Sequence, residues 1–315
     1  MNASIPDNSV MLATQHQFLF ALEGTPGTLA AMNAANATMN VYDLKIENTT
    51  KSEERQALGT DDQLPSVPGA AEGSLSFYTH AVVGTSPAWL NLLRCAGMVS
   101  SSGSSGVTFT PLTGATQTAS ATLPQWDATN TNGARLKQLA GVSLDLTISG
   151  EAGKLVKIEA KGQGVWKGLG SVAKYAPTYE TAPLYQFTGG SVTIGTNAAS
   201  VSKFSLAFGN TVTPVEDGTA GYLFFMIGGR KTKLTLDPLA QVSNDFYTAY
   251  QNGAAAAVSL SCVNGAHTLT IAAPAAQQAK APGEGDRGGK RVDELEFQAN
   301  RVGAGDDSLV ITVSA

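Results

Sequence analysis

The residues most able to do chemistry stand apart from one another in this chain. The three histidines, His16, His80 and His267, lie far apart in the sequence. Metal-binding motifs place two ligands within a few residues, and no histidine here has a partner at His-x-x-His or Glu-x-x-His spacing. His80 and His267 fall in stretches typical of strands, where we expect structural histidines. The sequence therefore predicts no metal site and no cofactor.

Two pairs of adjacent acids could serve calcium binding or acid–base catalysis. These are Asp61–Asp62 and Asp306–Asp307. Calcium needs several oxygen ligands at defined spacings, and neither pair has further carboxylates placed in that way. We therefore expect both pairs to be solvated turn residues.

The segment GEGDRG, residues 283–288, matches the Gly-x-Gly-x-x-Gly pattern of dinucleotide-binding proteins. That pattern binds a phosphate only between a strand and a following helix. Here AQQAKAP precedes it and the strand-like VDELEF follows, so we expect a flexible loop between strands. No Gly-x-Ser-x-Gly segment marks a nucleophilic serine. The sequence predicts that the protein is not an enzyme.

Composition limits the remaining functions. Charged residues make up 14% of the 315 residues, glycines number 34, and the net charge is −5. No cluster of lysine and arginine provides a footprint for a phosphate backbone, which argues against tight nucleic-acid binding. The start of the chain has no basic segment before its apolar run, so no secretory signal is predicted. No apolar stretch is long enough for a membrane-spanning helix.

Alternating apolar and polar residues predict strands along most of the chain. In each half we expect a strand, an open loop, a strand, a short helix, and further strands ending in a hairpin. In the first half the strands cover 41–48 and 74–83, the helix lies within 85–98, and the hairpin turns at GEAG, residues 150–153. In the second half the strands cover 200–210 and 232–241, the open loop 211–231, the helix 243–253, and the hairpin 292–313.

This recurring order predicts an internal duplication. We expect a mainly β protein with two tandem β-sandwich domains, each with a short flanking α-helix. The predicted divisions are an N-terminal arm over 1–40, a first sandwich over 41–163, a surface linker over 164–187 and a second sandwich over 188–315. Equivalent positions follow at a nearly constant spacing: Leu44 and Phe204, Leu75 and Leu234, Trp89 and Phe246, Leu144 and Leu295, Leu155 and Leu309.

Several segments recur together in one known family. They are FALEGTPGTLA near the start, ERQALGTDDQLPSVPGAAEGSLSF, LLRCAGM at the end of the predicted helix, and the late DRGG and DDSLVI. Together they resemble the major tail tube protein of long, non-contractile-tailed bacteriophages, in its tandem two-copy type. The Ala/Asn-rich stretch over 30–40 matches nothing in that pattern.

The resemblance implies a structural virion protein, made in the cytoplasm of the bacterial host and located in the phage tail. Its copies would self-assemble into stacked rings, trimeric with pseudo-sixfold symmetry because each chain carries two copies of the fold. DNA would pass through the lumen without specific binding. Other tail proteins, such as the tape measure, terminator and tip proteins, would be its further partners.

The resemblance also implies that the loop TDDQLPSVPG, residues 60–69, contacts a neighbouring subunit or ring. The second copy's counterpart carries five apolar residues in a row, which would anchor an interface if exposed. The open alternative is that this run is a buried strand. The predicted contact residues are Asp61, Asp62, Leu64, Pro65, Pro68, Tyr222, Leu223, Phe224, Phe225, Met226 and Arg230.

A carbohydrate-binding or adhesive β-sandwich module is the alternative function. It predicts a concave aromatic platform and a secretion signal, and the sequence shows neither. A hydrolase is a third possibility, opposed by the absence of a recognisable set of catalytic residues.

Overall fold

The computed structural model describes residues 11–50, 52–56, 63–103, 106–114, 117–127, 135–170, 175, 179–242, 244–303 and 305–314. The protein is mainly β, with 61% strand, 6% helix and two short α-helices. The predicted fold class is therefore confirmed in its main feature. Below, residues 11–170 are called the first half of the chain and residues 191–314 the second half.

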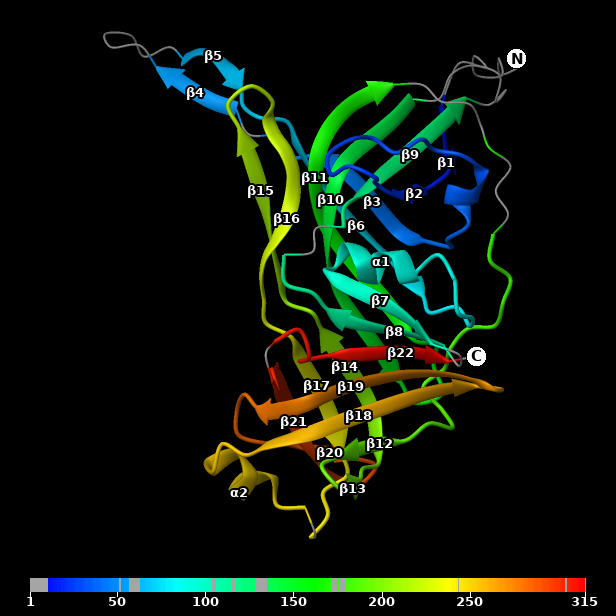
Figure 1. Cartoon of the computed structure of the whole chain (residues 1–315), viewed down its shortest axis with the longest axis vertical. Helices are drawn as coiled ribbons and strands as arrows, with labels where there is room; N and C mark the ends of the chain where they lie inside the picture. Colours follow the sequence, from blue (N-terminus) through cyan, green and yellow to red (C-terminus); the bar gives the residue numbers. More distant parts are fainter. Residues whose placement is uncertain are drawn as a thin grey trace, which may run out of the picture.

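One long antiparallel sheet runs through both halves (Figure 1). The sheet continues from one half to the other where Thr147–Glu151 pair with Lys203–Ala207. The sheet is held by backbone hydrogen bonds at this junction as it is elsewhere. Its strands, in spatial order, are β3 (Tyr42–Asn48), β6 (Glu72–His80), β11 (Lys157–Gly170), β10 (Arg135–Glu151), β14 (Val201–Ala207), β17 (Lys233–Pro238), β21 (Lys290–Asn300) and β20 (Gly283–Arg287).

A second row of strands lies against one face of the long sheet. It also joins the halves, because the last strand of the chain pairs with a strand of the first half. A hydrophobic core containing residues of both halves fills the space between the two layers, as in a β-sandwich. The row consists of β7 (Met98–Gly103), β8 (Gly106–Pro111), β22 (Val310–Ser314), β19 (His267–Gln278), β18 (Ala255–Asn264), β12 (Val192–Ile194) and β13 (Asn197–Ala198).

The two helices are buried to different degrees. In α1 (Leu90–Cys95), Leu90, Leu92, Leu93 and Cys95 are all buried, and the preceding Trp89 donates its indole N–H to the carbonyl of Val82 at 2.9 Å. In α2 (Phe246–Gln251) only Phe246 is buried. The α2 N-cap is Asp245, whose side chain accepts a hydrogen bond from the Thr248 N–H.

The structure corrects the predicted N-terminal arm over residues 11–40. Strands β1 (Met11–His16) and β2 (Leu19–Leu22) pair with β9 (Ala119–Asp127), which pairs in turn with β10. Residues 34–37 form a 3₁₀ helix η1 (Ala34–Ala37), capped by the side chains of Asn33 and Asn36. Residues 11–40 therefore belong to the first half. The strands are too short for their alternation to stand out in the sequence.

The predicted surface linker was also wrong in part. Strand β11 continues to Gly170, so residues 164–170 belong to the long sheet. Further along, Tyr185 is fully buried and Phe187 is 8% exposed, because both pack into the core. Apolar side chains in a Gly- and Pro-rich segment can fill gaps between layers, and composition alone does not show this.

The hairpin predicted at the end of the chain was wrong as well. Strand β21 pairs with β17, β19 and β20, while β22 pairs with β19 and β8. The hairpin predicted across residues 150–153 is confirmed by the β10–β11 pairing. Both halves contain the predicted succession of strand, connecting segment, strand and short helix. The duplication and its domain boundaries remain predictions.

Candidate assembly interface

The two segments predicted as open loops are β-hairpins. One consists of β4 (Ser52–Gln56) and β5 (Gln63–Pro68), and the other of β15 (Asn210–Asp217) and β16 (Gly221–Arg230). Each is a two-stranded sheet of its own. Prolines obscured β5 in the sequence, but a strand of an isolated hairpin has a free edge that needs no N–H donor.

The hairpins differ in their surroundings. Figure 1 shows β4–β5 projecting from the body, whereas β15–β16 runs along β10 and β11. In β4–β5, Val67 is 46% exposed. The predicted contact residues Leu64, Pro65 and Pro68 lie on β5. Asp61 and Asp62 fall outside the residues that the structure describes.

The predicted apolar run lies on β16, and its residues differ in burial. Phe225 is 1% exposed, and its carbonyl accepts a hydrogen bond from Ser143 Oγ at 2.7 Å. Its ring lies 5.8 Å from that of Tyr222. Leu223 is 42% exposed, and the remaining members of the run are half-buried. The run is thus a strand, as in the alternative reading, with Leu223 facing outward.

Two glycines of the first half make room for this strand. A Cβ at Gly27 would lie 2.0 Å from the carbonyl oxygen of Leu223, and one at Gly141 would lie 2.6 Å from the Cβ of Phe224. Both glycines have positive φ, at 79° and 62°. Only glycine combines that backbone conformation with so close an approach.

A buried carboxylate fixes both glycines. Glu23 is 4% exposed and accepts hydrogen bonds from the N–H groups of Gly27 and Gly141, each at 2.8 Å. The hydroxyls of Thr118 and Ser120 donate to it at 2.7 Å each. These four donors compensate the carboxylate for its loss of water. Glu23 therefore organises the surface on which β16 lies.

The end of β16 is attached to helix α1. Arg230 Nη2 donates to the carbonyl oxygens of Ala96 and Gly97, each at 2.8 Å, and Arg230 Nε donates to Asn210 Oδ1 at 3.0 Å. Burial lowers the pKa of Arg230, and the negative charge of Asp306 opposes this. A cation at the end of a helix satisfies carbonyls that have no partner within the helix.

Asn210 completes this attachment. Its side-chain amide donates to the carbonyls of Ala96 and Leu144, each at 3.0 Å, and its N–H donates to Asp145 Oδ1 at 2.8 Å. Sequence reasoning found Arg230 but missed Asn210, Glu23, Gly27 and Gly141. An acid that shortly precedes a Thr-Pro-Gly turn was the one local signal for Glu23.

Histidine and cysteine, the residue types that most often do chemistry, pack as structural residues at the positions described below. His80 is the last residue of β6, with its ring 5.6 Å from that of Tyr42 and 5.9 Å from that of Tyr78. In the part of the chain that the structure describes, no three His, Cys, Asp or Glu side chains gather into a metal-binding group. Burial raises the pKa of Cys262 to about 12, which keeps this thiol protonated and unreactive.

The acid pair at 306–307 lies in a turn, as predicted. Asp306 accepts from the N–H and the hydroxyl of Thr113, and Asp307 accepts from the N–H groups of Val302 and Gly303. The flexible loop predicted at GEGDRG was wrong. Residues 283–287 form β20, which turns into β21 at two glycines with positive φ.

Among the described residues, no helix is both long and apolar enough to cross a membrane.

Comparison with known proteins gives one family. No curated protein matches the sequence. A family model described as phage tail tube protein matches residues 13–299, which is most of the chain. The chain therefore belongs to the phage tail tube protein family and is a structural protein of the phage tail.

Proposed function

We propose that this protein is the repeating subunit of the tail tube, and that its copies join head to tail into rings that stack around a DNA channel. The observation that carries the proposal is the difference between the two hairpins. Hairpin β15–β16 packs against the other half of its own chain, whereas β4–β5 projects from the body and, among the described residues, has no comparable packing.

The hairpins occupy corresponding places in the chain. Each connects two neighbouring strands of the long sheet, β3 with β6 and β14 with β17, and each is followed by a short helix. Hairpin β15–β16 packs against the long sheet and the C-terminal end of α1. By analogy, β4–β5 lies on the second half of a neighbouring copy, near α2. There Tyr247 and Tyr250 are 41% and 38% exposed.

The edges of the long sheet support the same arrangement. Among the described strands, β3 pairs only with β6, and β20 pairs only with β21. A free edge is a template for another strand. The β10–β14 junction shows how two successive halves join within one chain. A similar junction between copies closes a ring, since a head-to-tail interface forms a ring when its rotation closes.

The finer features follow from the two-copy resemblance. Three chains form one ring with pseudo-sixfold symmetry, and DNA passes through without specific binding. The contact residues are the predicted ones on β5, the predicted Asp61 and Asp62 that precede it in the chain, and the exposed side of β16. The tape measure, terminator and tip proteins contact the tube in the virion. The protein has no catalytic role.

Removal of the free hairpin tests the proposal. Residues 52–68 are replaced by a short Gly-Ser connection between β3 and β6, and the purified protein is concentrated and viewed by negative-stain microscopy. We expect rings or tubes from the wild type, and a monomer with unchanged circular dichroism from the variant. Variant protein that assembles as the wild type does would refute the role of β4–β5. Wild-type protein that stays monomeric at every concentration would refute self-assembly.

A further inference from the structure

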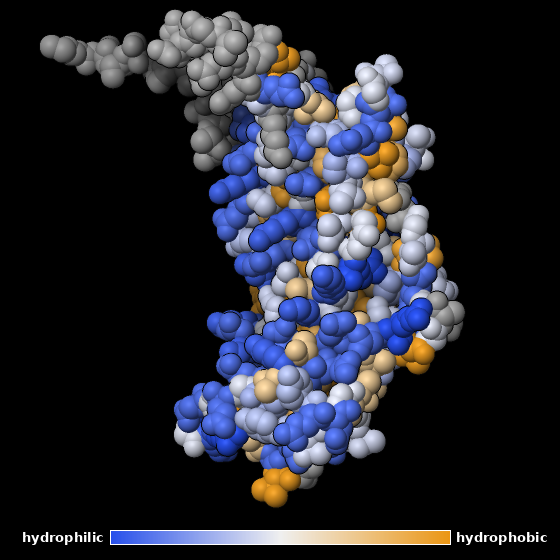
Figure 2. All heavy atoms as spheres, turned by 90° about the vertical axis from the view of Figure 1, so that its left-hand side faces the viewer, coloured by the Kyte–Doolittle hydropathy of each residue, from blue (hydrophilic) through white to orange (hydrophobic). Residues whose placement is uncertain are grey.

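The face of the long sheet that points away from the core is rich in charge. Along β11, Lys157 and Glu159 alternate with the buried Ile158 and Ala160, so the charged side chains point outward. Figure 2 shows hydrophilic side chains gathered in rows over this side of the molecule. A polar outer face is ordinary for an antiparallel sheet, but here it has a particular order.

Several lysines on this face lie next to glutamates. Lys157 is 2.7 Å from Glu159, and Glu296 lies 2.7 Å from Lys233 and 3.3 Å from Lys280. Lys203 is 3.9 Å from Glu294, and Lys154 is paired with Glu151. We call these residues the charge-paired face: Lys154, Lys157, Lys203, Lys233, Lys280, Glu151, Glu159, Glu294 and Glu296.

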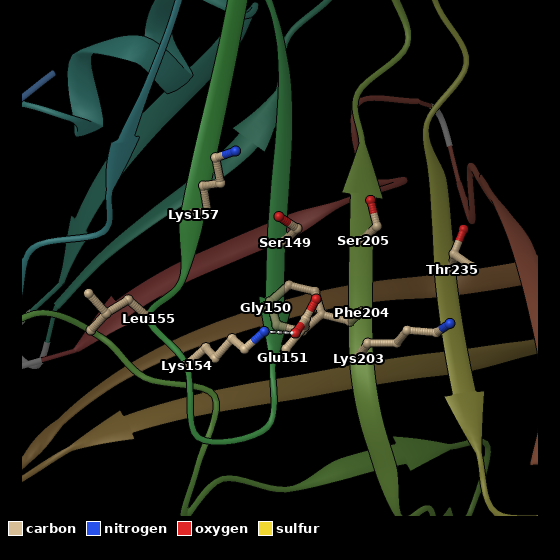
Figure 3. A pocket seen from close by; sticks show the side chains of 10 residues that line it. All are labelled: Ser149, Gly150, Glu151, Lys154, Leu155, Lys157, Lys203, Phe204, Ser205 and Thr235. Atoms are coloured by element: carbon tan, nitrogen blue, oxygen red, sulfur yellow. Dashed lines mark hydrogen bonds and ion pairs between the residues drawn. The ribbon is translucent and has the colours of Figure 1, made fainter. Parts of the chain in front are cut away.

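A hollow of about 340 Å³ lies within this face (Figure 3). Lys154, Lys157 and Lys203 line it, together with hydroxyl groups of β10, β14 and β17. Lysines and hydroxyls around a hollow are the groups that hold a phosphate. In Figure 3 the side chain of Glu151 points toward that of Lys154, so a carboxylate already pairs with this lysine at the hollow.

Stability does not account for this pairing. The side chains of Lys154 and Glu151 are 71% and 58% exposed, and exposed ion pairs contribute little to folding. Their effect on a polyanion is larger. Binding to DNA depends on lysine charges that replace counterions at phosphates, and an adjacent carboxylate competes for each lysine and repels the phosphate.

Glu151 and Glu296 remain ionised near neutral pH. Hydrogen bonds from Lys233 and Lys280 lower the pKa of Glu296. A hydrogen bond from Lys154 lowers the pKa of Glu151. The pairing is therefore present at the pH at which DNA is fully charged.

From this geometry we infer that the charge-paired face is a low-adhesion surface for double-stranded DNA, on which glutamates hold lysines that would otherwise bind phosphates. Removal of the glutamates should uncover a DNA-binding site on the same face. The inference deepens the proposed function, because it describes how a channel lined by this face would let DNA pass. It uses residues outside both hairpins, so it can fail or hold independently of assembly.

The test compares two variants of equal net charge. Glu294→Gln with Glu296→Gln frees Lys203, Lys233 and Lys280 from their partners. The control, Glu53→Gln with Glu216→Gln, removes two exposed acids from the hairpins. Each protein is titrated into a short fluorescent DNA duplex, and binding is followed by anisotropy. Size-exclusion chromatography with light scattering shows that each is used as the monomer.

We expect the face variant to bind the duplex at low salt, and the wild type and the control to show no saturable binding. Three freed lysines predict a roughly 40-fold loss of affinity between about 50 and about 200 mM salt. Adding Lys203→Gln and Lys233→Gln to the face variant should remove the gain. Equal binding by the face variant and the control would overturn the inference, and so would wild-type protein that binds as tightly as the face variant. Failure to form rings would bear only on the proposed function.

Discussion

Arg230 donates a hydrogen bond from Nη2 to the carbonyl oxygen of Gly97 at 2.8 Å, and this bond ties the second half of the chain to the helix of the first. The same nitrogen donates to Ala96. The two halves are therefore joined at the end of α1 as well as by the shared sheet.

Arg230→Met should weaken this junction. The substitution keeps much of the side-chain volume but leaves the carbonyls of Ala96 and Gly97 without these donors. The Asn210 amide and the Leu112 N–H still donate to these two carbonyls, but Asn210 Oδ1 loses its Arg230 donor. A hydrogen bond from a charged group contributes about 1.5–3 kcal/mol, so we expect a lower free energy of unfolding. Chemical denaturation provides the measurement, and Arg301→Met, at an exposed arginine, is the control. Equal stability of the two variants would show that Arg230 is not needed there.

The approach of Gly141 to Phe224 gives a second prediction. In Gly141→Ala the new Cβ would lie 2.6 Å from the Phe224 Cβ and would push β16 away from β10. Gly114→Ala is a matched control, since Gly114 also has a positive φ, at 76°, but has nothing within 4 Å of an added Cβ. Both variants bear the backbone cost of about 1 kcal/mol, and only Gly141→Ala bears the clash.

Limited proteolysis reads out the position of the hairpin. We expect cleavage within residues 211–229 to be faster in Gly141→Ala than in Gly114→Ala, with a lower Tm. If the two variants are cut at the same rate, then the packing of β16 against the first half does not depend on the contact between Gly141 and Phe224.

Much of the fold was readable from the sequence, because alternation is a local property. The strands β6, β10 and β14 follow a clear period of two, and α1 combines helical spacing with a proline before it and a glycine after it. The packing of β16 against the first half could not be predicted from the sequence. Glu23 and Gly141 are 118 residues apart, and no local pattern shows that a carboxylate will meet a distant N–H.

The hairpins were missed for a different reason. A long connection with Pro and Gly is typical of an open loop, and an isolated two-stranded hairpin is only marginally stable by itself. Hairpin β15–β16 is held by contacts with the first half of the chain, such as that of Ser143 with Phe225. Such support comes from tertiary structure and leaves no trace in the hairpin's own sequence.

Asp306 provides a prediction about pH. Hydrogen bonds from the hydroxyl and the N–H of Thr113 lower its pKa below the ordinary 3.8. A carboxylate with a lowered pKa in the folded state stabilises the protein above its unfolded pKa, and this contribution is lost as the pH falls through the folded value. Asp306→Asn should therefore lower the Tm at neutral pH, and the difference from the wild type should shrink below pH 3.8.

Asparagine suits this test because Asp306 has a positive φ of 61°, which asparagine tolerates well. Thermal melts of both proteins across the acid range give the comparison. A Tm difference that stays constant with pH would mean that the charge of Asp306 does not contribute.

Leu223 and Phe225 separate folding from assembly, because a bulge at Leu223 leaves its side chain exposed while the Phe225 side chain is buried. Leu223 is 42% exposed, and Phe225 is 1% exposed. Leu223→Asp should leave the circular dichroism and Tm of the monomer unchanged and should abolish rings or tubes, because a charge would then be desolvated at an apolar contact between subunits at a cost of a few kcal/mol. Phe225→Asp should destabilise the monomer itself, since its side chain has no access to water.

Val302→Asp, at a 64% exposed position in a turn, controls for added surface charge and should assemble normally. Tubes formed by Leu223→Asp as readily as by the control would remove Leu223 from the interface, and unfolding of Leu223→Asp would show that this side of β16 already packs within the chain.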